Sequence, residues 1–149
     1  MAEYLANLAQ TVNLNEPVIF NASIPCNRGL VYHEDETGVF ILRGKTCQCF
    51  ATYQVTFSGN IAIPTGGTVG PIATAITVNG QPRPTSRAQF TPAAVEEFGN
   101  VTSTAIIKVP AGCCFTVGVD YVSGTDDPAA TPAPAITVQN ANLVVSRIS

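Results

Sequence analysis

The feature that most constrains the fold is a stretch of strand-like alternation at residues 49–80. Between Tyr53 and Phe57 the bulky apolar residues take the odd positions and polar residues separate them, which is typical of a strand with one buried face. The alternation returns at residues 72–78, where Asn79-Gly80 follows and suits the positive φ angles of a hairpin turn. The pattern predicts two strands of one sheet, joined by a Gly/Pro-rich loop and covered by a second layer.

The rest of the chain repeats short strand patterns and offers almost no helix. Alternation recurs at residues 101–109, 113–122 and 135–148, which makes about eight to ten strands in all, a number and spacing typical of a β-sandwich or jelly roll. Residues 2–10 have some helical character. Residues 92–97 fit a short helical turn and an irregular strand equally well.

Composition indicates a domain that hides part of its surface in an oligomer. The 149 residues fit one domain with a real core. Charged residues make up 11% of the chain, against about 25% in ordinary soluble domains. There is no run of about 18 apolar residues, so no membrane-spanning helix is expected. An obligate homo-oligomer accounts best for so little charge. A net charge of −3 with seven scattered basic residues predicts no nucleic-acid partner.

The start of the sequence predicts a docking arm. It has an early acid and no basic region, so it is not expected to be a secretory signal peptide. Nine residues are too few for a stable free helix. We therefore expect residues 1–11 to form an arm that anchors the protein on a partner or neighbouring subunit through Tyr4, Leu5 and Leu8, and residues 12–149 to form the jelly roll.

Three segments resemble a known family. Cys49-Phe-Ala-Thr-Tyr-Gln-Val-Thr-Phe57 resembles the G-x-Y-x-F-x-[FY] strand of C1q/tumour-necrosis-factor-like jelly rolls. Residues 76–80 are similar to its following strand and Asn-Gly hairpin, and residues 142–148 to its closing strand. Residues 63–72 and 91–98 look most like the bacterial and phage branch, which includes the heads of spore-surface collagen-like proteins and small phage structural proteins.

The resemblance implies a homotrimer in which each jelly roll buries one face against its two neighbours. On that basis, apolar residues of the central and last strands are expected to supply both core and intersubunit burial: Tyr53, Val55, Phe57, Leu143 and Val145. An interface of this kind would make folding and trimerisation inseparable.

Few side chains are candidates for a disulfide, a metal site or catalysis. The spacings of Cys47, Cys49, Cys113 and Cys114 favour buried small hydrophobes; a disulfide between the two clusters is the main alternative, and a thiolate metal site a weaker one. His33, the only histidine, is interpreted as part of a solvated loop tip. The acidic residues beside it, or Asp126-Asp127, offer oxygen ligands for Ca²⁺ without EF-hand spacing. No cofactor and no catalytic activity are expected.

The sequence therefore predicts a non-enzymatic structural protein. The first hypothesis is a trimeric virion component of a phage, a capsid decoration or head spike whose partner is the major capsid protein or neighbouring trimers. The alternatives are a spore-surface or appendage subunit, and a carbohydrate- or receptor-binding trimeric head. The expected location is the virion surface, or otherwise the spore surface.

Overall fold

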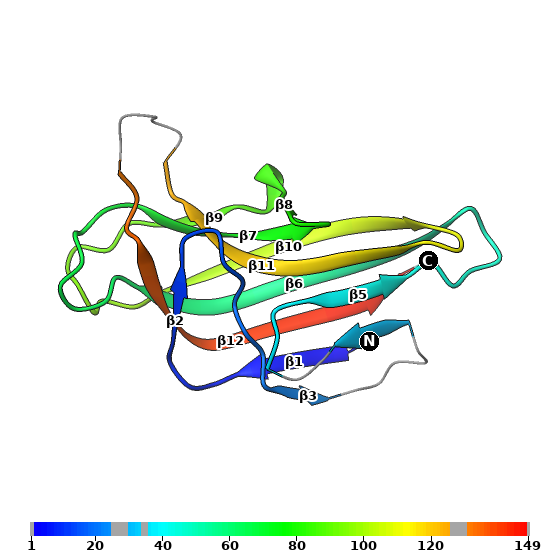
Figure 1. Ribbon diagram of the computed structural model, residues 1–149, viewed down its shortest axis with the longest axis horizontal. Helices are drawn as coiled ribbons and strands as arrows, with labels where there is room; N and C mark the ends of the chain where they lie inside the picture. Colours follow the sequence, from blue (N-terminus) through cyan, green and yellow to red (C-terminus); the bar gives the residue numbers. More distant parts are fainter. Residues whose placement is uncertain (1, 25–29, 34–35, 126–130, 149) are drawn as a thin grey trace.

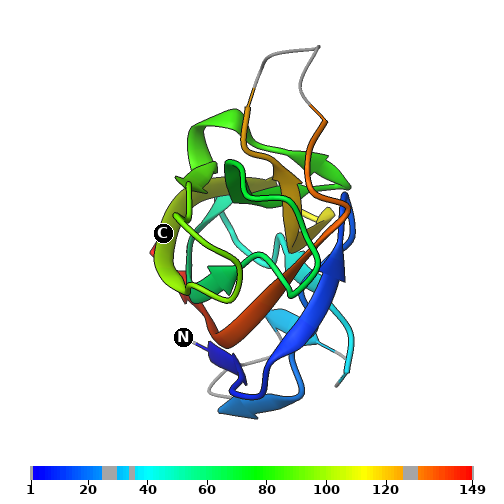
Figure 2. The ribbon, with the colours of Figure 1, turned by 90° about the vertical axis from the view of Figure 1, so that its left-hand side faces the viewer.

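The strands of the protein form two sheets stacked face to face, seen from the front in Figure 1 and end-on in Figure 2. The computed structural model describes residues 2–24, 30–33, 36–125 and 131–148. These residues contain twelve strands and one short 3-10 helix. The expected all-β jelly-roll sandwich is confirmed.

The first sheet has the order β10-β6-β12-β1-β3, with β2 also paired to β12. Every pairing in it is antiparallel. β12 shifts register between Gln139 and Asn142, and the shift separates the part that pairs with β2 from the part that pairs with β1. The strands of this sheet are β1 (Ala2–Ala6), β2 (Gln10–Asn13), β3 (Ala22–Ile24), β6 (Phe50–Ala62), β10 (Gly99–Pro110) and β12 (Ala135–Arg147).

The second sheet has the order β4-β5-β11-β7-β8, with β9 also paired to β7. Its members are β4 (Val31–His33), β5 (Phe40–Arg43), β7 (Ile72–Val78), β8 (Gln81–Pro82), β9 (Ala88–Phe90) and β11 (Cys114–Ser123), and η1 (Pro84–Ser86) lies between β8 and β9. The expected hairpin after β7 is confirmed, because Val78 pairs with Gln81 while Asn79 has φ 53° and Gly80 φ 82°.

The two strands of residues 49–80 lie in different sheets, so the expectation that they share one sheet is wrong. β6 pairs with β10 and β12, whereas β7 pairs with β8, β9 and β11. The Gly/Pro-rich loop between them crosses from one layer to the other. Alternation along each strand predicts a buried face but does not say which strand lies alongside, and that is why the pairing was misjudged.

The core lies between the sheets and is built from the inward positions of the long strands. Along β10, burial alternates as the sequence predicted: Val101, Ser103, Ala105, Ile107 and Val109 are buried, and the residues between them are exposed. β7 is buried on both faces rather than one. Tyr53 ties the two sheets together, because its hydroxyl donates a hydrogen bond to the backbone carbonyl of Arg43 at 2.6 Å.

Neither of the two segments with some helical character forms a helix. Residues 2–6 form strand β1, which pairs with β12 on one side and β3 on the other. Residues 92–97 form bends and a turn, and the 3-10 helix lies instead at Pro84–Ser86. In both places, tertiary contacts outweigh the local helical propensity. In the first, the free edge of β12 supplies backbone partners that a nine-residue helix in solution would lack.

Candidate functional site

The outward face of the first sheet is an open surface, which we call the outer face. It consists of the alternate residues that point away from the core on β6 and β10: Thr52, Gln54, Thr56, Ser58, Asn60, Asn100, Thr102, Thr104, Ile106 and Lys108. Nine of these ten are uncharged. β12 continues the face with Asn142, Val144 and Ser146, which lie opposite Ser58, Thr56 and Gln54.

Hydrogen bonds between neighbouring strands organise the outer face. The hydroxyls of Thr56 and Thr104 lie 3.3 Å apart. The side-chain amide of Asn100 donates to Asn60 Oδ1 at 3.2 Å and contacts Ser58 Oγ at 3.4 Å. Thr102 Oγ1 in turn donates to Asn100 Oδ1 at 3.1 Å. These short side chains hold one another in a flat polar layer whose groups are already largely paired within the face.

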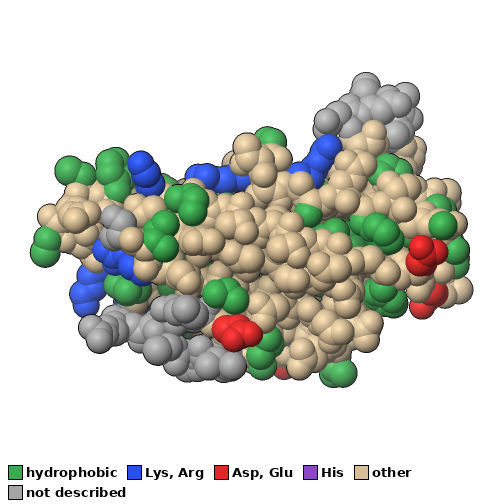
Figure 3. Space-filling model, turned by 180° about the vertical axis from the view of Figure 1, so that it is seen from behind, with side chains coloured by type: hydrophobic (Ala, Val, Ile, Leu, Met, Phe, Trp, Pro, Cys, Tyr) green, Lys and Arg blue, Asp and Glu red, His purple; other side chains and the backbone are tan. Residues whose placement is uncertain are grey.

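Charges stand only at the borders of the outer face. Lys108 lies on β10, the edge strand of the sheet, and Glu3 lies on β1 beyond β12. Glu3 accepts a hydrogen bond from Asn142 Nδ2 at 2.6 Å. Figure 3, which views the molecule from this side, shows a broad uncharged centre with basic side chains along its upper edge and one end.

The five residues expected to serve both core and trimer interface lie in the core of the chain itself. Tyr53, Val55, Phe57 and Leu143 are 0% exposed and Val145 is 1% exposed. Side chains with no exposed surface have nothing left to bury against a neighbour, so the intersubunit part of that expectation is corrected. The polar residues between them on the same strands form the open face. The sequence carries a signal for this face, because the alternate positions on these strands are almost all uncharged.

The proposed arm divides between core and surface. Tyr4 is 2% exposed and its ring packs edge-on against Phe40 at 4.5 Å and His33 at 4.9 Å between ring centroids. Leu5 is half-buried, and Leu8 is 78% exposed. Because Tyr4 is a core residue of its own chain, it is not available to dock on a partner. Anchoring through Leu8 stays a prediction.

All four described cysteines are exposed and free, so their interpretation as buried hydrophobes is wrong. Cys47 and Cys49 lie in the loop after β5, Cys113 lies in the turn before β11, and Cys114 is the first residue of β11. Backbone hydrogen bonds join these two segments, from Gly44 N–H to Cys113 O at 2.8 Å and from Ala111 N–H to Cys49 O at 2.9 Å. The alternative disulfide between the clusters is not formed in this structure. Cys26 lies outside the described residues.

His33 is a packed residue of β4 rather than part of a solvated tip. Its ring stacks on Phe40 at 4.2 Å between centroids, and its Nε2 lies 2.9 Å from the carbonyl oxygen of Thr37. Residues 34–35 and 126–127, which carry most of the candidate Ca²⁺ ligands, lie outside the described residues. Among the residues that are described, no three His, Cys, Asp or Glu side chains come together as a metal site.

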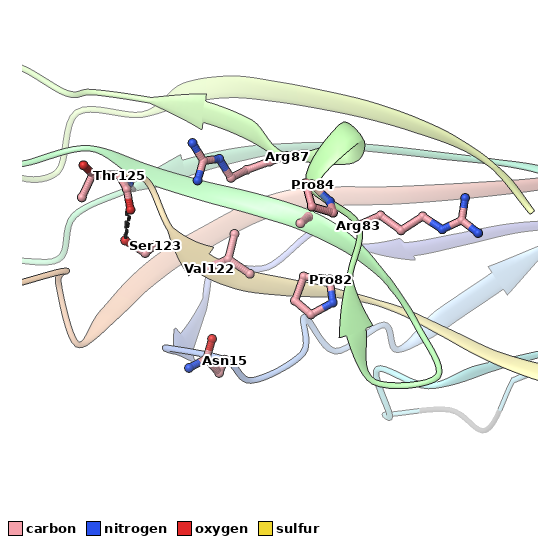
Figure 4. Close-up of a pocket in the computed structure, with 9 residues that line it drawn as sticks. Asn15, Pro82, Arg83, Pro84, Arg87, Val122, Ser123 and Thr125 are labelled. Atoms are coloured by element: carbon pink, nitrogen blue, oxygen red, sulfur yellow. Dashed lines mark hydrogen bonds between the residues drawn. The ribbon is translucent and has the colours of Figure 1, made fainter. Parts of the chain in front are cut away.

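A shallow groove of about 410 Å³ lies on the outward face of the second sheet, the face that points away from the core. Ala75 and Val122 contribute to its wall, and Pro82, Pro84 and Arg87 flank it. Figure 4 shows Arg83 and Arg87 reaching away in opposite directions rather than converging on one point. No aromatic side chain lines the groove, although aromatic faces are the usual platform for apolar sugar surfaces. The groove therefore does not favour the carbohydrate-binding alternative.

Asp120 is the one described carboxyl with a clear pKa change. Its side chain is half-buried on β11, and burial raises the pKa from 3.8 to about 6. Burial also raises the pKa of Tyr121, whose hydroxyl donates to the carbonyl of Ala133 at 2.7 Å. No helix in the described residues is long and apolar enough to cross a membrane.

Comparison with solved structures identifies the fold. The chain matches the globular domain of zebrafish complement 1qA protein with a TM-score of 0.56 and 16% identity, over 99% of this chain and 97% of that one. It matches Eiger TNF from S. frugiperda with a TM-score of 0.62 and 9% identity, over 100% of this chain and 92% of that one. No family model matches the sequence, and no curated protein matches it. The fold is thus a C1q/TNF-type jelly roll.

Proposed function

We propose that this protein is a non-enzymatic structural protein that assembles as a homotrimer through its outer face. The observation that carries the proposal is the uncharged polar layer on β6, β10 and β12. Solvent-facing sheet surfaces ordinarily carry interspersed charges, and burying a charge costs far more than burying a paired hydroxyl or amide. A face whose charges stand only at its borders is suited to burial against another copy.

The border charges of the outer face suit contact with another copy of the chain. Lys108 and Glu3 have opposite signs and stand on opposite borders of the outer face. A heterologous contact brings unlike borders of neighbouring subunits together, and a closed ring results when the rotation closes. The sequence resemblance to C1q/TNF-like jelly rolls implies that the ring has three members. The low charge of the whole chain, 11%, supports the same conclusion.

The more specific role we propose is a capsid decoration or head spike on a phage virion, with the major capsid protein or neighbouring trimers as partners. The support is the resemblance of residues 63–72 and 91–98 to small phage structural proteins. The second candidate is a spore-surface or appendage subunit. Its specific support is the end of the sandwich that exposes four thiols, because covalent cross-linking suits a permanent surface layer.

The oligomeric proposal is tested by measuring native mass with a matched pair of substitutions. We expect sedimentation to give three times the 15.5 kDa of one chain. Gln54→Glu places a charge in the outer face, and Gln89→Glu places the same charge on exposed β9 of the other sheet. We expect the first variant to weaken self-association by about tenfold or more, equivalent to about 1.4 kcal/mol, and the second to leave it unchanged.

Two outcomes would contradict the oligomeric proposal. One is a native protein that sediments as a monomer at every concentration. The other is an equal response to Gln54→Glu and Gln89→Glu, which would mean that self-association does not use the outer face. The role on a virion or spore is tested separately, by asking whether the tagged protein is recovered on purified particles and at the same position in every particle.

A further inference from the structure

One end of the sandwich gathers cysteine side chains from two segments far apart in the sequence. β5 ends at Arg43, and the loop of residues 44–49 leads to β6. The turn of residues 110–113 joins β10 to β11, closed by a hydrogen bond from Cys113 N–H to Pro110 O at 3.0 Å. Hydrogen bonds from Gly44 to Cys113 and from Ala111 to Cys49 hold the loop and the turn together. We call this part the cysteine end.

The exposure of these thiols is unusual. Free cysteine is among the residue types most often buried, where it behaves as a small hydrophobe. Here all four described cysteines are exposed and unpaired, while the core of the same chain is filled by aliphatic and aromatic side chains. Packing therefore does not explain why cysteine occupies these positions. What remains is the chemistry of the thiol, which at an exposed position is available to oxidants and to other thiols.

Bonds within one chain fit this arrangement poorly. Cys113 and Cys114 are adjacent, and neighbouring Cα atoms lie about 3.8 Å apart, below the roughly 4.4–6.8 Å of ordinary disulfides. Across the strands, Cys114 lies opposite Arg43, while the backbone hydrogen bonds join Cys113 to Gly44 and Cys49 to Ala111. Neither this register nor these backbone hydrogen bonds place one cysteine directly opposite another. No metal-binding group of three ligands is present among the described residues.

We propose that the cysteine end forms disulfide bonds to the same end of a second copy of this chain, with Cys47 and Cys49 as the reacting residues. Figure 1 shows the loop of residues 44–49 projecting beyond the turn of residues 110–113, at the right-hand extremity of the molecule. A thiol on this loop meets a neighbouring molecule before any other part of that end does. A second copy offers matching thiols on a loop that projects equally far.

The bond forms by thiol–disulfide exchange with a low-molecular-weight disulfide, such as oxidised glutathione, as the oxidant. The thiolate of one chain attacks the oxidant, which forms a mixed disulfide and releases one glutathione thiol. The thiolate of the second chain attacks the protein sulfur of that mixed disulfide and releases the second glutathione. Two protein thiols are oxidised to one disulfide, and one glutathione disulfide is reduced to two glutathione molecules.

The charge at the cysteine end predicts how the rate of cross-linking depends on salt concentration. Arg43 and Lys45 are exposed on the same segment as the reacting thiols, so two copies approach with like charges. Raising the ionic strength from about 0.01 M to about 1 M shortens the screening length from about 30 Å to about 3 Å. Cross-linking between two copies is therefore expected to become faster with salt. Capture of an acidic protein at this end would become slower.

The test uses the full chain, reduced and then exposed to oxidised glutathione. Denaturing gels without reductant are expected to show a two-chain product that disappears when reductant is added. Replacing Cys47 and Cys49 by serine should lower its yield by about tenfold or more, since access governs exchange. Cys113→Ser with Cys114→Ser is the matched control, and should retain most of the product. The rate of the second step, in which an unmodified chain attacks the isolated mixed disulfide, should rise with salt.

Three results would overturn the proposal. The first is a chain that stays single on the gel and loses only two hydrogen atoms in mass, which would show an internal disulfide. The second is a chain that gains only glutathione. The third is a two-chain product that persists without Cys47 and Cys49. The proposal does not rest on the homotrimer, since the gel separates all non-covalent contacts and Gln54→Glu is expected to affect native mass without altering the cross-link.

Discussion

Two residues at the end of β7 set the backbone conformation on which β8 depends. Asn79 and Gly80 have positive φ angles of 53° and 82°, a conformation that glycine adopts freely and that costs other L-residues roughly 1–2 kcal/mol. The side chain of Asn79 also accepts a hydrogen bond from Thr116 N–H at 3.0 Å. The turn is therefore fixed both by its own backbone and by its contact with β11.

We expect Gly80→Ala to lower the free energy of unfolding by about 1 kcal/mol, because Cβ is disfavoured at positive φ. No atom lies within 4 Å of the added carbon, so strain rather than collision causes the loss. Denaturant unfolding measures it. Gly70→Ala is the control, since it is equally open and lacks a positive φ. Equal stability of the two variants would contradict this account of the turn.

Asp120 is expected to make stability depend on pH. Its pKa is about 6 in the folded chain against 3.8 for the free group. Below about pH 4 both states hold the proton. As the pH rises toward 6, the unfolded chain releases it while the folded chain retains it, so the free energy of unfolding falls. The side chain is half exposed, and solvent screening reduces the size of the loss.

Unfolding by denaturant between pH 4 and 7 tests this expectation, with Asp120→Asn as the comparison. The variant cannot ionise at this position, so its stability should fall less than that of the unmodified chain over this window. Identical pH profiles would show that burial of Asp120 does not contribute. Measurements below pH 4 serve as the reference, because there the carboxyl is protonated in both states.

At the scale of elements, β1 shows that pairing with the edge of a strand can make a strand of a segment whose sequence has some helical character. Ala2–Ala6 pairs residue by residue with β12 and also with β3. Tyr4 then packs with Phe40 of β5, in the opposite sheet. The segment is a strand of the first sheet that helps to close the sandwich.

Substitutions in this segment separate a structural strand from an anchoring arm. Tyr4→Ala is expected to lower the free energy of unfolding by about 3 kcal/mol, because it removes a fully buried aromatic ring. Leu8→Ala should change it by less than about 0.5 kcal/mol, since Leu8 is 78% exposed. Thermal or denaturant unfolding measures both. Similar small effects would mean that β1 detaches easily, as an independent arm would.

At the scale of the whole molecule, the two sheets present different outward faces. The first sheet leaves its polar outer face open across β6, β10 and β12. On the second sheet, the outward Ala73 and Ala75 of β7 are buried with Val122 in a small separate apolar cluster. The outward side of β7 in the second sheet is thus covered by residues of the same chain, whereas the outer face of the first sheet is not. This asymmetry supports our proposal that the outer face is the side that packs against a second copy.

Much of the local structure was predictable because it depends on residues close together in the sequence. Alternation along residues 101–109 and 135–148 predicted strands and their buried faces, and Asn79-Gly80 predicted a hairpin. The low charge predicted that some surface is covered. Each of these inferences rests on a period, a turn conformation or a composition, none of which requires knowledge of what lies alongside.

The tertiary structure decided which strands pair with one another. Strand pairing in turn determined which residues lie on each surface. The placement of β6 and β7 in opposite sheets, the capture of β1 by the edge of β12 and the exposure of the four cysteines all depend on long-range contacts. Alternation marks a buried face and an exposed face of each strand, but the pairing of distant strands determines which face lies outward and what gathers there. That is why the core was predictable and the candidate surfaces were not.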